Sequence, residues 1–203
     1  MIRTIIFDIG NVLSGFGWKD FYESKGYTGE RLERLAAATT KSDDWVQFDK
    51  GCLQTEQIID LFVENDPGIE MDIRKVLADV SGMMKHFPYA IPWIKALKAA
   101  GYQVLVLSNF SEKVLQDCWG ALDFLPYTDG GILSFQDKLV KPDPAIYHLL
   151  LYRYHLNPQE CVFIDDMSVN VEVAKALGIH GICFKDRAQA VRELNGLGVY
   201  WEE

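Results

Sequence analysis

The sequence predicts an α/β protein with a doubly wound parallel sheet as its core and a small all-helical cap inserted after the first strand. Two observations predict this fold class. Along most of the chain, short continuous apolar runs alternate with helical patterns, which is typical of strands buried on both faces of a parallel sheet. Between residues 15 and 87 only helical patterns occur. We therefore expect a core of residues 1–14 and 88–203 and a cap of residues 15–87.

The predicted strands all end at polar residues. Because their apolar residues are consecutive and do not alternate, helices should cover both faces, and right-handed crossovers should give a Rossmann-like sheet. The chain has 203 residues and is 49% hydrophobic, which is enough to build such a core. In chain order the runs are "TIIF" (4–7), "QVLVL" (103–107), "CVFI" (161–164) and "GICF" (181–184).

The predicted helices fall into two groups. A cap inserted after the first strand should lie above the carboxyl ends of the strands, where doubly wound folds bind ligands. The cap segments are "WKDFYESKG", "TGERLERLAAATT", "DDWVQFDKG", "TEQIIDLFVEN" and "DIRKVLADVSGMMKH". The core segments are "IPWIKALKAAG", which ends at a glycine, "SEKVLQDCWGAL", which follows Asn109, "DPAIYHLLLYRYH", which has a proline in its first turn, and "NVEVAKALGI".

The polar residues at the strand ends should meet in one crevice, because parallel strands present their carboxyl ends to the same edge of the sheet. Asp8 ends the first run, and Asp165 and Asp166 end the third. Taken alone, Asp8 also fits a turn, and Asp166 with Asn170 also fits the start of a helix. Together, three carboxylates at one edge would repel each other unless a cation were present. Hard oxygen ligands of this kind suit Mg²⁺.

Anion-binding groups are predicted at the same edge. Ser108 and Asn109 end the run "VLVLSN", where a hydroxyl, a side-chain amide and backbone N–H groups can donate to an anion, although a simple helix cap would use the same residues. Lys141 lies in the loop "LVKPDP", beside the stiffening Pro142. A loop lysine is usually a surface residue, but a fixed cation here would balance a phosphate next to three carboxylates.

Four motifs resemble those of the haloacid dehalogenase superfamily, whose members are mostly phosphatases. They are "FDIGNVL", "LSN", "KPDPAIY" and "FIDDMSVNVEVAKALGI", in this order and spacing. The resemblance covers the whole chain, because the helical insertion resembles the small cap of one class of the superfamily. "DIGNVL" is similar to sugar-phosphate phosphatases of the α-D-glucose-1-phosphate phosphatase type, and more distantly to the phosphatase domain of soluble epoxide hydrolases. The resemblance implies a Mg²⁺-dependent hydrolase of a small phosphorylated metabolite, a sugar phosphate.

The resemblance also implies roles for individual residues. Asp8 would be the nucleophile and form an aspartyl-phosphate, while Ser108, Asn109 and Lys141 would hold the phosphoryl oxygens. The metal ligands would be Asp8, the backbone carbonyl of Gly10 and Asp166, with Asp165 binding the ion directly or supporting a ligand.

Gly10 departs from the family pattern. Most family phosphatases have an aspartate at this position, which serves as general acid and base. Its absence puts turnover in doubt and favours an alternative, a catalytically weak member that binds a phosphorylated ligand or regulates a partner. A haloacid dehalogenase uses the same kind of nucleophile without a metal, and the Asp165–Asp166 pair argues against it. A phosphomutase is a further alternative.

Composition limits the partners and the location. The net charge of −9 argues against nucleic-acid and membrane partners, and the sequence does not predict protein partners. The four cysteines form no CxxC motif, and the N-terminus has no signal-peptide pattern, so we expect a cytoplasmic protein. Aromatic residues of the cap region could line a substrate pocket, although their helical spacing is more typical of core packing; they are Phe16, Trp18, Phe21, Tyr22 and Trp45.

Overall fold

A five-stranded parallel sheet forms the centre of the computed structural model, which describes residues 1–202. The strand order β5-β4-β1-β6-β7 confirms the predicted doubly wound α/β core, with β1 between β4 and β6. The strands are β1 (Thr4–Phe7), β4 (Gln103–Ser108), β5 (Gly131–Leu133), β6 (Cys161–Asp165) and β7 (His180–Cys183). β5 was not predicted, because three residues with two glycines close by carry no strand pattern.

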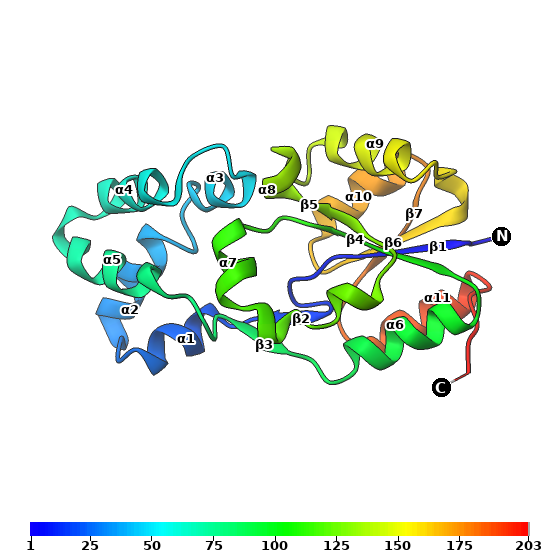
Figure 1. The fold of residues 1–203 in the computed structure, drawn as a ribbon, viewed down its shortest axis with the longest axis horizontal. Helices are drawn as coiled ribbons and strands as arrows, with labels where there is room; N and C mark the ends of the chain where they lie inside the picture. The colour runs from blue at the N-terminus through cyan, green and yellow to red at the C-terminus, as the bar shows by residue number, and fades with distance from the viewer. Residues whose placement is uncertain (203) are drawn as a thin grey trace.

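Helices cover both faces of this sheet (Figure 1). In the figure, α9 and α10 lie above it and α6 and α11 below it, and every residue of β1 and β6 is buried between these layers. The α-helices of this part are α6 (Ala90–Ala99), α7 (Glu112–Asp117), α8 (Ser134–Asp137), α9 (Pro144–Arg153), α10 (Ser168–Ala176) and α11 (Arg187–Gly196). Short 3₁₀ turns are η2 (Trp119–Ala121), η3 (Leu125–Tyr127) and η4 (Pro158–Glu160).

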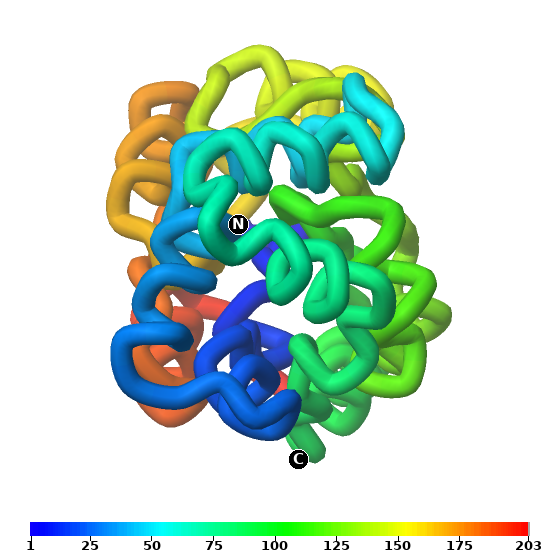
Figure 2. Tube along the Cα trace, turned by 90° about the vertical axis from the view of Figure 1, so that its left-hand side faces the viewer, coloured from blue at the N-terminus to red at the C-terminus, as the bar shows by residue number. Residues whose placement is uncertain are grey.

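Helices also make up most of residues 15–87, and they lie beyond the carboxyl ends of the strands (Figures 1 and 2). They are α1 (Trp18–Ser24), α2 (Gly29–Ala38), α3 (Trp45–Lys50), α4 (Thr55–Asn65) and α5 (Glu70–Ala78), with the 3₁₀ turn η1 (Pro67–Ile69). The expectation of an all-helical insertion was incomplete. β2 (Ser14–Phe16) and β3 (Met84–His86) pair antiparallel where the chain leaves and re-enters the core. Strands of three residues give no periodic signal, so their pairing could not be predicted from the sequence.

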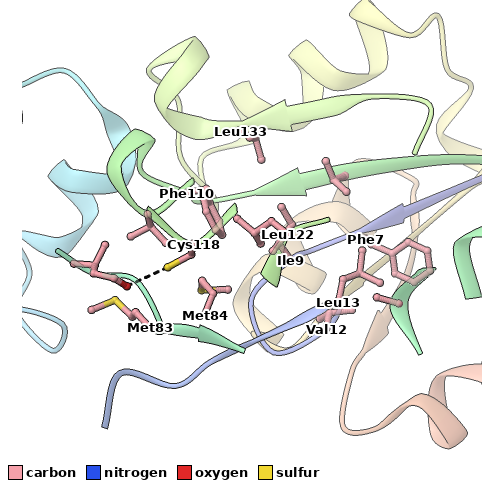
Figure 3. Close-up of a cluster of buried hydrophobic side chains, with 14 of the residues drawn as sticks. Phe7, Ile9, Val12, Leu13, Met83, Met84, Phe110, Cys118, Leu122 and Leu133 are labelled. Atoms are coloured by element: carbon pink, nitrogen blue, oxygen red, sulfur yellow. Dashed lines mark hydrogen bonds between the residues drawn. The ribbon is translucent and has the colours of Figure 1, made fainter. Parts of the chain in front are cut away.

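Apolar packing joins the two parts of the chain. Figure 3 shows Met83 and Met84, which flank the start of β3, in the same cluster as Ile9 and Leu13, which follow β1. Cys118 lies in this cluster, and its thiol donates to the carbonyl of Val80 at 3.1 Å. The two short strands therefore rest on a continuous apolar core.

Within residues 1–202, every helix is too short or too polar to cross a bilayer.

Candidate active site

A cavity of about 400 Å³ opens at the carboxyl edge of the sheet, between the core and the helical insertion. Each site residue predicted from the sequence lines it, except Asp165, which lies fully buried behind the wall. The core contributes Asp8, Gly10, Asn11, Ser108, Asn109, Phe110, Ser111, Val114, Lys141, Asp166, Met167 and Asn170. The insertion contributes Phe16, Thr40, Trp45, Asp49 and Met84.

Lys141 lies between two carboxylates. Its Nζ is 2.8 Å from Oδ1 of Asp8 and 2.6 Å from Oδ2 of Asp165, and all three side chains are buried. Burial alone would lower the pKa of Lys141, but the two carboxylates outweigh it and hold this pKa above its ordinary value. Lys141 is therefore a fixed cation and not a surface residue.

Asp8 is held at the end of β1, where its N–H donates to the carbonyl of Ile164 at 2.8 Å. Burial raises the pKa of its carboxyl group, and the negative charge of Asp165 adds to this, while Lys141 opposes it. Its Oδ1 is buried and is paired with Nζ of Lys141 at 2.8 Å, whereas its Oδ2 lies outside this ion pair, on the side of Gly10 at the cavity. Asp8 thus presents a carboxylate oxygen that is available to a ligand.

Asp165 and Asp166 have different surroundings. Both oxygens of Asp165 are bound: they accept from the N–H of Met167 at 2.7 Å, from Lys141, and from the Asn170 amide at 3.1 Å. Asp166 is half-buried and accepts through Oδ2 from the Asn11 amide at 2.9 Å, which leaves its Oδ1 free among the described residues. Burial raises the pKa of Asp166.

The donor set fits Mg²⁺. Asp8, Asp165 and Asp166 each offer an oxygen atom, and these atoms lie within 4.8 Å of one another. One lysine does not neutralise three carboxylates, so a divalent cation would balance the remaining charge. Asp8 keeps its Oδ2 outside the pair with Lys141, and Asp166 keeps its Oδ1 outside the bond from Asn11, which makes these two acids the available ligands.

Ser108 is the last residue of β4 and Asn109 follows it, but their surroundings differ from the predicted helix N-terminus. Helix α7 begins only at Glu112, with Ser111 as its cap, so no helix end abuts Asn109. The Asn109 side chain bonds to the backbone of Lys141 in both directions, donating at 2.9 Å and accepting at 2.7 Å. It therefore fixes the loop that carries the lysine, while the buried Ser108 faces the cavity.

Eight residues of the cavity were not singled out by sequence reasoning, and two of them, Asn11 and Asp49, bear on its chemistry. Asn11 has a left-handed backbone (φ 57°), a conformation that asparagine tolerates; besides binding Asp166, its side chain accepts from the N–H of Phe16 at 3.1 Å. Asp49, in the last turn of α3, is the second. The only available signal for Asp49 was an acidic residue in the helical pattern "DDWVQFDKG", which is more typical of a solvated face.

The aromatic residues of the cap region have separate roles. Phe16 and Trp45 line the cavity, with ring centroids 5.9 Å apart. Phe21 and Tyr22 are buried in the core, and Trp18 packs on Tyr22. Only two of these five aromatic residues therefore reach the cavity.

The family model for haloacid dehalogenase-like hydrolases matches residues 2–178. "Acyl-CoA dehydrogenase family member 10" of Mus musculus is 30% identical over 96% of this chain and 19% of its own length. "Flavin mononucleotide hydrolase 1" of Arabidopsis thaliana is 23% identical over 76% of this chain and 62% of its own length. "(S)-2-haloacid dehalogenase 1" of Pseudomonas sp. is 27% identical over 63% and 57%. The chain thus spans less than two thirds of each of these relatives.

A solved structure with the same fold is the HAD family enzyme BT-2542 of Bacteroides thetaiotaomicron, in complex with magnesium and inorganic phosphate. It is 21% identical, and the alignment covers 94% of this chain and 99% of that chain, with a TM-score of 0.68.

Proposed function

The chain belongs to the haloacid dehalogenase-like hydrolase family, and we propose that it is a Mg²⁺-dependent phosphomonoesterase acting on a small phosphorylated metabolite through an aspartyl-phosphate. The observation that carries this proposal is the position of Asp8 in the cavity, where one carboxylate oxygen pairs with the fixed cation Lys141 and the other lies outside that pair. A phosphoryl group placed there would meet a nucleophile and a charge that neutralises its oxygens.

We assign the roles as follows. Asp8 attacks phosphorus, and Lys141 and Ser108 hold the phosphoryl oxygens in place. Asp8, Asp166 and the carbonyl of Gly10 would hold Mg²⁺, which when bound supplies positive charge to the phosphoryl oxygens. Asp165 and Asn109 position Lys141, because both bond to it directly.

We propose that residues 1–14 and 88–203 form a core and that residues 15–87 form a cap that selects the substrate. The cavity supports this division, because residues of both parts line it. A sugar phosphate is the substrate class that we propose. Thr40 supports it, because this cavity residue carries a hydroxyl group of the kind that bonds to sugar hydroxyls. We also propose a cytoplasmic location, because Cys52, Cys118, Cys161 and Cys183 are all free thiols.

A haloacid dehalogenase is the second candidate. The absence of a carboxylate side chain at Gly10 and the resemblance to a named dehalogenase favour it. The free oxygens of Asp8 and Asp166 favour the metal-dependent phosphatase instead, because dehalogenation by an aspartate nucleophile needs no second carboxylate for a metal.

Phosphate release from 4-nitrophenyl phosphate, measured with Mg²⁺ and with EDTA, tests the proposal. We expect Mg²⁺-dependent release of phosphate by the parent protein and by the control variant Asp43→Asn, because Asp43 is exposed. A folded Asp8→Asn variant should release none, because an amide has the same shape as the carboxylate but is a poor nucleophile. Chloride release from 2-chloropropionate is measured in parallel. Chloride release without phosphate release, or an active Asp8→Asn variant, would refute the proposal.

A further inference from the structure

We propose that Asp49, on helix α3 of the cap, is the general acid that protonates the leaving-group oxygen, the task for which Gly10 has no side chain. This inference rests on the proposed phosphatase function and adds a catalytic residue to it. The core carboxylates are occupied: Asp8 is the nucleophile, Asp166 faces the metal position, and Asp165 is fully bonded. A proton donor therefore has to come from the opposite wall of the cavity.

Asp49 is placed on that wall. It is half-buried, it lines the cavity that contains Asp8, Ser108 and Lys141, and its side chain has no hydrogen bond or ion pair within residues 1–202. Its backbone is fixed to the core, because its carbonyl accepts from the hydroxyl of Ser134 at 2.5 Å. An immobilised backbone and an unused carboxyl group are what a proton donor requires.

The electrostatic environment keeps the group protonated near neutral pH. Burial raises the pKa of Asp49 to about 8, the charge of Asp8 adds to this, and Lys141 opposes it. Of the charged groups on the elements packed against α3, Lys138 beside α8 donates to the backbone carbonyls of Gly51 and Phe135. Asp137 of α8 pairs with Arg153, and Asp60 of α4 pairs with Arg74. A carboxylic acid with this pKa carries a proton that it can donate.

The proton balance is complete with this one residue. Asp8 attacks phosphorus, the bond from phosphorus to the ester oxygen breaks, and that oxygen takes the proton of Asp49 as the alcohol leaves. Water then attacks phosphorus, the bond from phosphorus to the Asp8 oxygen breaks, and the Asp49 carboxylate takes a proton from the water. Phosphate leaves, Asp8 is a carboxylate again, and Asp49 is a carboxylic acid again.

The dependence of rate on the leaving group tests the role. In single turnovers with Mg²⁺, we expect Asp49→Asn to slow release of the alcohol from n-propyl phosphate by about 10²- to 10⁴-fold, since general acid catalysis contributes that much. Release of 4-nitrophenol should change by less than about 10-fold, because this leaving group departs as a stable anion. Asp43→Asn is the matched control, because Asp43 is an exposed carboxylate of the cap, and this variant should behave like the parent protein.

A second variant restores the acid from the core. A Cβ atom added at Gly10 meets only Oδ2 of Asp8, at 3.9 Å, and the φ angle of Gly10 is not positive, so a side chain fits. We expect Gly10→Asp to recover most of the n-propyl phosphate activity that Asp49→Asn loses. The parent protein gives a measurement without substitution: as pH rises through the pKa of Asp49, its n-propyl phosphate rate should fall while its 4-nitrophenyl phosphate rate does not.

The outcomes separate this inference from the proposed function. A parent protein that hydrolyses neither ester would refute the phosphatase function. An active parent in which Asp49→Asn slows both esters equally, or neither, would refute the role of Asp49 alone. If the hydrolysis rates of the two esters by the parent protein changed in the same way as the pH rises, the role of Asp49 would also be refuted, whether or not the Asp49→Asn variant folds.

Discussion

Asp165 and Asp166 are neighbours in the sequence, yet their side chains have different tasks. The four hydrogen bonds that Asp165 accepts leave it no free oxygen, so it supports the Lys141 ion pair and the turn at Met167. Asp166 has a free oxygen at the cavity. At the scale of single residues, the hydrogen-bond donors around each carboxylate decide which of the two can bind a metal.

We expect Asp166→Asn to weaken Mg²⁺ binding by at least about 10-fold with little loss of stability in the absence of metal. Asp165→Asn should instead lower the free energy of unfolding by up to about 3 kcal/mol, because it removes one partner of a buried ion pair. Titration calorimetry with Mg²⁺ and urea unfolding measure the two effects. If the Asp165 variant were the weaker Mg²⁺ binder and fully stable, our assignment of the two acids would be reversed.

At the scale of elements, the contact of α3 with α8 sets the position of Asp49. Gly51 ends α3 in a left-handed conformation (φ +64°), and a Cβ atom there would lie 2.8 Å from the Cβ of Phe135 and 3.0 Å from its Cα. Glycine therefore allows the end of α3 to approach the backbone of α8. The contact joins the cap to the core immediately beside Asp49.

Gly51→Ala should move α3 away from α8 and lower the single-turnover rate by up to about 100-fold, because catalysis is sensitive to displacements of about 1 Å. Gly29→Ala is the control, since Gly29 has a similar φ angle (+54°) with nothing within 4 Å of its Cβ position. We expect this control to lose only about 1 kcal/mol of stability and to keep the parent rate. Equal rates for the two variants would show that the α3–α8 contact does not position the site.

At the scale of the whole molecule, cap and core share one apolar cluster. It contains Phe62 of α4 and Phe7 of β1, both fully buried. Phe62 also contacts the rings of Trp45 and Phe48, with centroids 5.8 Å and 6.2 Å away. Because apolar packing runs through both parts without a break, we expect them to unfold together.

Phe62→Ala should lower the free energy of unfolding by about 3–5 kcal/mol and the melting temperature by roughly 10 °C, in a single transition that includes the core. Met71→Ala on α5, where the side chain is 85% exposed, should have almost no effect. Calorimetry checks the number of transitions, and circular dichroism checks the melting temperature. A separate transition of the cap at lower temperature would contradict the expected cooperativity.

The sequence by itself determined the α/β core and the edge of the sheet at which the candidate site lies. Four apolar runs each end at polar residues. Because strands that are covered on both faces have consecutive apolar residues, the strands of the parallel sheet could be predicted from this local pattern. Parallel strands bring their carboxyl ends to one edge, so Asp8, Ser108 and Asp166 could be placed in one crevice before any distance was known.

Only the tertiary structure decided which of these groups are free and what faces them. The pairing of Asn109 with the Lys141 backbone, the bonds that occupy Asp165, and the approach of Asp49 from the cap each join residues on different elements. β2, β3 and β5 likewise depend on partners distant in the chain. Local periodicity reports how one segment is buried, whereas these contacts depend on how segments are packed together, and for that reason the pattern of residues could not reveal them.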